Sequence, residues 1–279
     1  MTDFYLYRHA WISAPHHNEL LSDEQCDTLL KKGGWMVRNT YDFDQKEASD
    51  FWYIIKDSFD GMEELSSNER NKIRRALKSF DYKRVSKQFV IDNGYDILKK
   101  VYDDYVVKDR VMNETVFQRL MEGWDEKENE FWGAFDKYNG RMLGFAVVRL
   151  FDAGCFYDMV TFYPKYKHNA TYPYYGFFYK LNEYYLGEKK FNYVTDGSRS
   201  ITEHSNIQPF LEQNFNFRKA YCKLKIRYKW WFRVIVKMLY PFRKVMPIRS
   251  IKAVLFMHGM QGGLSKSIDP KSSHGQPQG

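Results

Sequence analysis

The densest group of side chains that could do chemistry is the segment TDGSRSITEHSN, residues 195–206. Asp196, Glu203 and His204 are candidate general bases, because a carboxylate or an imidazole can take a proton from an attacking amine, directly or through water. Ser198 is a candidate proton donor. The segment follows an apolar run and precedes a helical pattern, which is where open sheets place ligands. The alternative is that Asp196 and Ser198 simply cap backbone N–H groups in a loop.

A second candidate is the polar loop between the apolar run that ends at Pro164 and the helix that begins near Pro173. A helix N-terminus offers unpaired N–H groups and the positive end of a dipole, so it can hold a phosphorylated cofactor. Tyr174 is a further candidate proton donor. We expect a pocket beside this loop, lined by Phe162, Tyr163, His168, Asn169, Tyr174 and Asp196.

The composition narrows the class of protein. Three cysteines among 279 residues, at no metal-like spacing, argue against a disulfide framework and for a reducing compartment. His16 and His17 are adjacent in a loop and have no third ligand at a suitable spacing, so no metal site is expected. The 22 Tyr and 22 Phe residues indicate either an aromatic core or rings along a substrate groove.

No signal sequence or membrane span is visible. The start, MTDFYLYRHAW, has no apolar core segment, and the most apolar run, WWFRVIVKMLY, is interrupted by Arg233 and Lys237. We therefore expect a cytoplasmic protein, with peripheral association at the inner membrane face as a further option.

The charge is distributed unevenly along the chain. The net charge is +8, but residues 213–279 hold 14 Lys and Arg against one acid, Asp269, so this part carries +13 and the rest carries −5. Such asymmetry favours an anionic partner, which could be an acyl carrier protein, tRNA or an anionic membrane surface; the alternative is a solvated basic face. Residues 229–258 are expected to form a basic amphipathic helical extension, and the Gly/Ser/Pro-rich residues 259–279 a disordered tail.

The hydrophobic patterns predict an α/β protein with a mixed sheet. From Tyr82 they read strand, helix, helix, three strands, helix, strand, helix, strand. The strands that hold residues 158–163 and 192–195 are joined through a helix, so we expect them to run parallel and to diverge at their carboxyl ends. Upstream, residues 66–80 form a predicted helix with Ser66 and Glu69 in a capping-box pattern, and Arg70, Arg74 and Lys78 on one face.

This order of elements, with the strand that ends in Pro164, resembles the GNAT acyltransferase superfamily. The resemblance implies a GNAT-like acyl-CoA N-acyltransferase fold, with acyl-CoA held by the loop and the helix after that strand. The cofactor-binding positions that it implies are Lys165, Lys167, His168, Asn169, Ala170, Thr171 and Gly176. Asn206 matches a position that is commonly polar in the family.

Two departures from the family pattern concern the cofactor and the acid. Asn169, Ala170 and Thr171 stand where the family has a glycine-rich turn. In the family, a Tyr in the last helix often precedes a Gly-Phe pair and acts as a general acid. The matching pair here is Asn216-Phe217, and Glu212 stands at the Tyr position.

The N-terminal part resembles the Fem-type branch, GNAT-related enzymes that transfer amino acids to peptidoglycan precursors. The helix SSNERNKIRRA is similar to a basic helix of that branch, and the resemblance covers roughly residues 35–228. Residues 1–81 are expected to pack, as a partial repeat of strands with a helix, on a GNAT-like domain at residues 82–228.

These patterns predict an enzyme, an N-acyltransferase that moves an acyl or aminoacyl group from a thioester or ester donor to the amine of a small molecule or peptide. Acyl-CoA, an acyl carrier protein and an aminoacyl-tRNA are the candidate donors. The alternative is a GNAT scaffold without catalytic activity that binds an anionic partner or a membrane surface.

Overall fold

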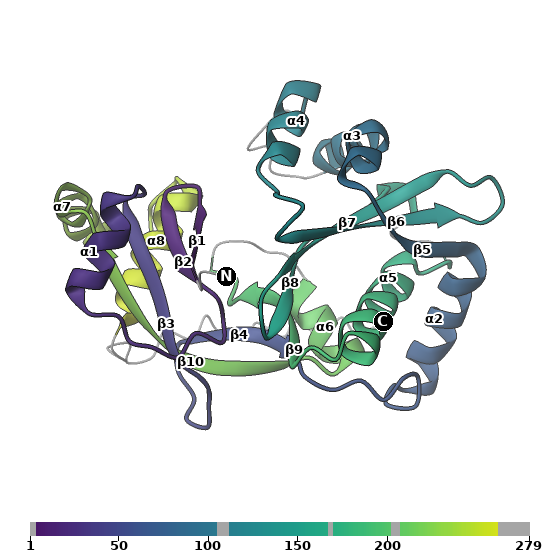
Figure 1. The fold of residues 1–279 in the computed structure, drawn as a ribbon, viewed down its shortest axis with the longest axis horizontal. Coiled ribbons are helices and arrows are strands. Elements are labelled where there is room, and N and C mark those ends of the chain that lie inside the picture. The colour runs from purple at the N-terminus through teal and green to yellow at the C-terminus, as the bar shows by residue number, and fades with distance from the viewer. Residues whose placement is uncertain (1–3, 105–111, 167–169, 202–206, 262–279) are drawn as a thin grey trace, which may run out of the picture. The chain divides into compact units, whose positions relative to one another are not determined.

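The computed structural model describes residues 4–104, 112–166, 170–201 and 207–261, and its chain divides into two compact units (Figure 1). The larger unit contains Tyr53–Arg199 and Ser205–Lys219. The smaller unit contains Thr2–Trp52, Ser200–His204 and Ala220–Gly279. Both are mixtures of strands and helices, so the α/β class predicted from the sequence is confirmed, whereas the boundaries at residues 82, 229 and 259 stay predictions.

Six neighbouring strands form the sheet of the larger unit, in the order β4-β9-β8-β7-β6-β5. Their bounds are β4 (Phe51–Lys56), β5 (Phe80–Val85), β6 (Asn129–Asp136), β7 (Met142–Leu150), β8 (Gly154–Phe162) and β9 (Tyr193–Ser198). All neighbours are antiparallel except β8 and β9, which are parallel. The predicted parallel pair is therefore present, and the remaining strands make the sheet mixed.

Helices cover both faces of this sheet (Figure 1). On one face lie α3 and α4, and on the other lie α2 and α5, with α6 beside α5. Their bounds are α2 (Ser67–Ser79), α3 (Lys87–Asp104), α4 (Glu114–Glu122), α5 (Pro173–Asn182), which continues as a π-helix (Glu183–Glu188), and α6 (Ile207–Phe215). Helix α2 begins where the sequence predicts, because the Ser66 side chain accepts a hydrogen bond from the Glu69 N–H at 3.4 Å.

Aromatic rings fill the space between the sheet and α5. The Phe162 ring lies edge-on to Phe80, and Tyr82 packs against Phe177. Phe178 packs against the α6 residue Phe215. Many of the aromatic side chains are thus buried in the core, which agrees with the aromatic core that the composition predicts as one of two alternatives.

The smaller unit holds four strands in the order β1-β2-β3-β10. Its elements are β1 (Phe4–Tyr7), β2 (Ala10–Ser13), α1 (Asp23–Lys31), β3 (Met36–Gln45), β10 (Arg218–Tyr228), α7 (Trp230–Leu239), a 3₁₀ turn (Tyr240–Phe242) and α8 (Arg249–Gly259). Strands β2 and β3 are parallel, whereas β1–β2 and β3–β10 are antiparallel.

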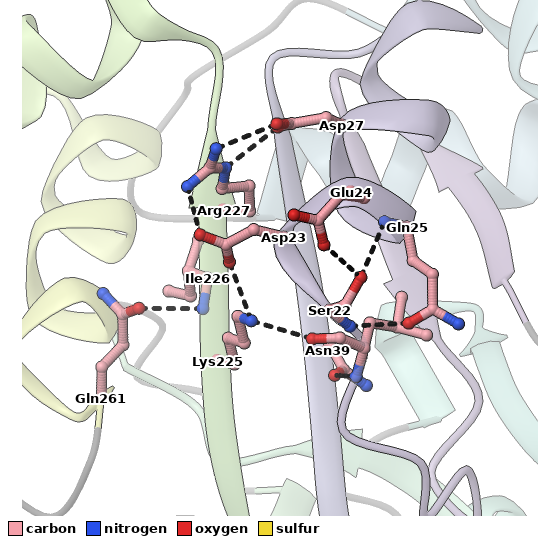
Figure 2. Close-up of polar contacts among 11 residues, drawn as sticks. Ser22, Asp23, Glu24, Gln25, Asp27, Asn39, Lys225, Ile226, Arg227 and Gln261 are labelled. Atoms are coloured by element: carbon pink, nitrogen blue, oxygen red, sulfur yellow. Dashed lines mark hydrogen bonds and ion pairs between the residues drawn. The ribbon is translucent and has the colours of Figure 1, made fainter.

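Ion pairs fix α1 to β10 in this unit, and a hydrogen bond joins Gln261, just after α8, to the same strand (Figure 2). Arg227 donates both nitrogens of its guanidinium fork to Asp27, at 2.9 Å each, and also pairs with Asp23. Lys225 reaches the Asp23 carboxylate at 2.9 Å. From the α8 side, the Gln261 side chain accepts the Ile226 N–H at 2.8 Å, which satisfies a backbone donor of β10.

All three cysteines are free and buried. Burial raises the pKa of the Cys222 thiol to about 12 and raises the pKa of Cys26 and of Cys155 as well. A thiol with a raised pKa is a poor nucleophile at neutral pH, so these three side chains act as small core residues.

One charged pair of the larger unit lies in the interior. Lys56 at the end of β4 is only 2% exposed, and its ammonium lies 3.0 Å from the Glu64 carboxylate, which is 11% exposed. Burying an ammonium is tolerated only when a partner compensates it. The segment from β4 to α2 therefore depends on this pair.

We expect Glu64→Ala to lower the free energy of unfolding by about 3 kcal/mol, because it leaves a buried ammonium without its partner. The double variant Lys56→Met/Glu64→Ala should recover most of that loss. Urea unfolding of the full chain measures both. Asp57→Ala is the matched control: its pair with Arg218 is roughly 40% exposed on both sides and should contribute about 1 kcal/mol or less. An unchanged loss in the double variant would contradict this account.

Candidate functional site

The candidate site lies where β8 and β9 separate. In the described part of the chain the two strands are paired at Gly154, Cys155 and Phe156 of β8, opposite Tyr193, Val194 and Thr195 of β9. Strand β8 then continues to Phe162 and β9 to Ser198 with no further pairing between them recorded among the described residues. The divergence agrees with the sequence prediction and leaves an edge of β8 backbone beside the start of α5.

A bulge in β8 accompanies the separation. The register between β7 and β8 shifts between Val147 and Val148, so Asp158 has no residue opposite it. A bulge bends its strand and increases the local twist. The Asp158 carboxylate accepts the Trp124 indole N–H at 2.8 Å and lies 3.8 Å from Arg149. Burial raises the pKa of Asp158, and these two partners oppose that rise.

On β9 the separation begins at a glycine. Gly197 has φ 95°, a left-handed value that a residue with a side chain rarely adopts. Its N–H is held by the Thr195 hydroxyl at 2.9 Å, and that hydroxyl donates to the Ile54 carbonyl at 2.6 Å. Thr195 therefore satisfies a backbone N–H of this segment, a role that the alternative interpretation had given to Asp196 and Ser198.

The predicted catalytic residues are only partly described. Asp196 and Ser198 are half-buried in β9, and the Ser198 carbonyl accepts a hydrogen bond from Gln208 of α6 at 3.0 Å. The Asp196 charge helps to raise the pKa of Tyr157, so the two side chains interact electrostatically where β8 and β9 separate. Glu203, His204 and Asn206 lie outside the described residues.

The predicted lining residues at the end of β8 point to opposite faces of the sheet. Phe162 packs with Tyr174 at the start of α5. The Tyr163 hydroxyl instead accepts a hydrogen bond from Arg141 at 2.9 Å and donates to Asp96 of α3. Adjacent strand residues alternate in this way, so Phe162 lies with Tyr174 and Tyr163 lies on the other face. Lys167, His168 and Asn169 lie outside the described residues.

The start of α5 is formed by packing rather than by a side-chain cap. Tyr172 has a left-handed φ of 49°, and Pro173 opens the helix. A Cβ at Gly176 would lie 2.5 Å from the Tyr82 hydroxyl, which donates to the Pro173 carbonyl at 2.8 Å. Gly176 thus makes room for a tyrosine of β5, which is a structural reason for a glycine at this predicted cofactor position.

A shallow depression of about 450 Å³ is lined in part by Tyr166 and Thr171, which precede α5. Its lining residues come from the end of α2, the start of β5, the turn between β6 and β7 and the loop before α5: Lys78, Ser79, Phe80, Asp136, Lys137, Tyr138, Tyr166 and Thr171. Lys165 and Ala170 of the loop are exposed, and the Lys165 ammonium lies over the Tyr166 ring at 4.9 Å. The lining of the depression therefore combines three aromatic rings with two lysines and one aspartate.

Two residues at the site, Tyr157 and Asn182, were not predicted from the sequence. The buried Tyr157 hydroxyl donates to the Asn182 side chain of α5 at 2.8 Å, just past the last paired position of β8. Burial first, then Cys155, Tyr185 and Asp196, raise the pKa of Tyr157 well above its usual value, so this hydroxyl keeps its proton. The available signal was Asn182 itself, because an amide within an apolar helix needs a polar partner.

Asn216 and Glu212, which make up the departure at the family's acid, each have local contacts in the structure. Asn216 has φ 56°, and asparagine tolerates this left-handed conformation at a helix end almost as well as glycine does. Its side chain also donates to the Glu64 carbonyl at 3.0 Å. Glu212, at the position of the family's Tyr, lies 3.8 Å from Lys219.

Neither a metal-binding group nor a membrane-spanning helix is present among the described residues. No group of three or more His, Cys, Asp and Glu side chains in this part of the chain is arranged to hold a metal ion. Within the same residues, no helix combines the length and the apolar character needed to cross a bilayer.

Comparison with solved structures identifies the fold. FemX matches with a TM-score of 0.51 at 10% identity, over 71% of this chain and 75% of FemX. L-PGS from Bacillus licheniformis has a TM-score of 0.43 at 9% identity, over 85% of this chain and 83% of that one. A tandem GNAT protein from the clavulanic acid biosynthesis pathway has a TM-score of 0.40 at 6% identity, over 79% and 75%. No family model matches the sequence, and no curated protein is similar to it.

The chain therefore has a GNAT-type, Fem-like fold, as the sequence resemblance predicted. At 10% identity, the likeness to FemX defines the fold alone.

The packing role of Gly176 can be tested without any ligand. We expect Gly176→Ala to lower the unfolding temperature of the free protein, because the added methyl group overlaps Tyr82 and overpacking of this kind costs about 1–3 kcal/mol. Gly187→Ala is the matched control, since its Cβ would approach only the Phe59 ring, at 3.2 Å. Equal melting temperatures for wild type and Gly176→Ala would show that the glycine has no packing role.

Proposed function

We propose that this protein is an N-acyltransferase that moves an acyl or aminoacyl group from an ester or thioester donor to an amine. The observation that carries the proposal is the separation of β8 and β9 after the pair Phe156 and Thr195, beside the start of α5. A gap between parallel strands admits an extended acyl donor, and the edge of β8 supplies backbone N–H groups that can polarise a carbonyl.

The residues at the gap supply the remaining chemistry of acyl transfer. An amine must lose a proton as it attacks, and the leaving oxygen or sulfur must gain one. Asp196, at the end of β9, is the proposed base, and Glu203 and His204, which lie outside the described residues, stay the other candidates from the sequence. Ser198 and Tyr174 are the candidate proton donors. Tyr157 and Asn182 act as positioning residues, because their hydrogen bond fixes β8 against α5.

A macromolecular ester, such as an aminoacyl-tRNA, is the donor that we favour over free acyl-CoA. Tyr82 occupies the space above Gly176, and the family's glycine-rich turn is replaced at Ala170 and Thr171. Exposed cations of α2 continue from the depression that borders this loop: Arg74, Arg75 and Lys78. Such a row suits the phosphate backbone of an RNA. The acceptor is the amine of a small molecule or a peptide.

The transfer reaction is tested with the full chain, a pool of charged tRNA or a panel of acyl-CoA thioesters, and amine acceptors. We expect transfer from charged tRNA, and Asp196→Asn should slow it by about 10²–10⁴, the usual effect of losing a general base. Asp152→Asn is the matched control, because this carboxylate is exposed in the turn between β7 and β8. Equal rates for Asp196→Asn and wild type would exclude Asp196 as the base.

The same assay separates the donors. Transfer from acyl-CoA, together with CoA binding measured by calorimetry, would show that the donor is a thioester and would reject aminoacyl-tRNA as the donor. Replacement of Arg74, Arg75 and Lys78 by Gln should weaken tRNA binding and leave binding of free CoA unchanged. Unchanged tRNA binding in this variant would reject α2 as an RNA contact.

A second candidate function is a binding protein on a GNAT scaffold. The observation in its favour is Glu212, which stands at the position of the family's acid and is paired with Lys219. A protein that binds tRNA or an acyl donor and transfers nothing to any amine would favour this candidate.

A further inference from the structure

An unusual share of the exposed apolar side chains belongs to the segment after β10. Among the described residues, thirteen large hydrophobic side chains are exposed, and seven of them lie between residues 230 and 248. These are Trp230, Val234, Ile235, Met238, Phe242, Val245 and Ile248. Trp230 is 80% exposed, Val245 76% and Met238 61%. We call these seven residues the apolar surface.

The apolar surface has a helical order. Trp230, Val234 and Met238 follow one another at four-residue intervals in α7, so they form one stripe along the helix. The opposite side of α7 is packed: Phe232 lies against Trp35 and Tyr228, and Val236 is buried. The helix is thus already fixed to its own unit by one face, and the exposed stripe is not a core face left open.

The turn and helix that follow are also anchored. The Tyr240 ring lies edge-on to His258 of α8, and His258 in turn contacts the Tyr228 hydroxyl at 3.4 Å. Leu255 is buried, and Gln261 holds β10. The apolar surface is therefore presented by a packed helical hairpin.

Positive charge accompanies the apolar surface. Residues 229–261 contain no Asp or Glu and seven cations: Lys229, Arg233, Lys237, Arg243, Lys244, Arg249 and Lys252. Arg233 and Lys237 stand one residue before Val234 and Met238, so they border the stripe. Their charges lower the pKa of His258 further below its usual value, after burial, which is the larger cause.

The cations of β10 are different, because acids of the protein neutralise them. Lys225 and Arg227 pair with α1, as Figure 2 shows, and Lys223 pairs with Asp42 at 2.8 Å. Arg218 and Lys219 likewise have carboxylate partners. Among the described residues, no carboxylate pairs with Lys237, Lys244 or Lys252, so positive charge that is open to an outside partner lies beside the apolar surface.

We infer that the apolar surface and its bordering cations dock the protein on an anionic lipid bilayer, with α7 lying in the plane of the interface. Exposed Trp and aliphatic side chains beside Lys and Arg match the interface between acyl chains and anionic head groups. An RNA would offer phosphates to the cations but no contact for Val234, Val245 and Ile248. The inference does not depend on the transfer reaction.

Vesicle flotation of the full chain tests the inference. We expect flotation with phosphatidylcholine vesicles in which about one lipid in three is phosphatidylglycerol, weaker flotation at higher salt, and none with phosphatidylcholine alone. Replacing Trp230 and Phe242 by Ala should weaken binding by at least about tenfold. Replacing Arg233, Lys237 and Lys244 by Gln should weaken it by about a hundredfold, roughly fivefold for each charge.

Two control variants keep the result specific. Tyr138→Ala removes an exposed aromatic ring from the larger unit, and Lys31→Gln/Lys32→Gln removes two exposed cations from α1. Both should float as the wild type does, and circular dichroism verifies that every variant is folded. Failure of the wild type to float with anionic vesicles would overturn the inference. So would a tRNA gel shift that needs Trp230 and Phe242, or flotation of the Trp230→Ala/Phe242→Ala variant equal to that of wild type.

Discussion

The limited pairing of β8 with β9 is the constraint on which the candidate site depends. A parallel pair that stays closed along its length leaves no backbone edge for a ligand. Here the bulge at Asp158 bends one strand, and the left-handed Gly197 turns the other. Trp124 and Arg149 hold the Asp158 side chain at the bulge, and the Thr195 hydroxyl holds the Gly197 N–H at the turn. The separation of the two strands therefore depends on these residues of the sheet itself.

The larger elements could be predicted from the sequence because each has a local signal. The Ser66 cap, the polar loop after Pro164 and the helix-linked crossover all follow from residue types and spacing, and the parallel pairing follows from them. The bulge at Asp158 could not be predicted, since it depends on how two strands pair. The same is true of the hydrogen bond between Tyr157 and Asn182, whose residues are distant in the sequence.

Individual positions were harder still. A glycine beside a helix start reads equally well as a phosphate contact or as a packing site, and only the position of Tyr82 reveals the packing at Gly176. Phe162 and Tyr163 were both predicted to line one pocket, yet their side chains point to opposite faces of the sheet. The charge count of the C-terminal part was also incomplete as evidence, because ion pairs with α1 and Asp42 neutralise part of it internally.

The state of the three cysteines has a practical consequence. Because every native thiol is buried and its pKa is raised, thiol reagents at neutral pH will spare them. A pair of cysteines introduced at exposed positions, one in each unit, with Tyr138 as the position in the larger unit, would then carry fluorophores or spin labels while the three native cysteines stay in place. The native cysteines therefore need not be removed before labelling. Distances between labels in the two units would then report how the units are arranged in solution.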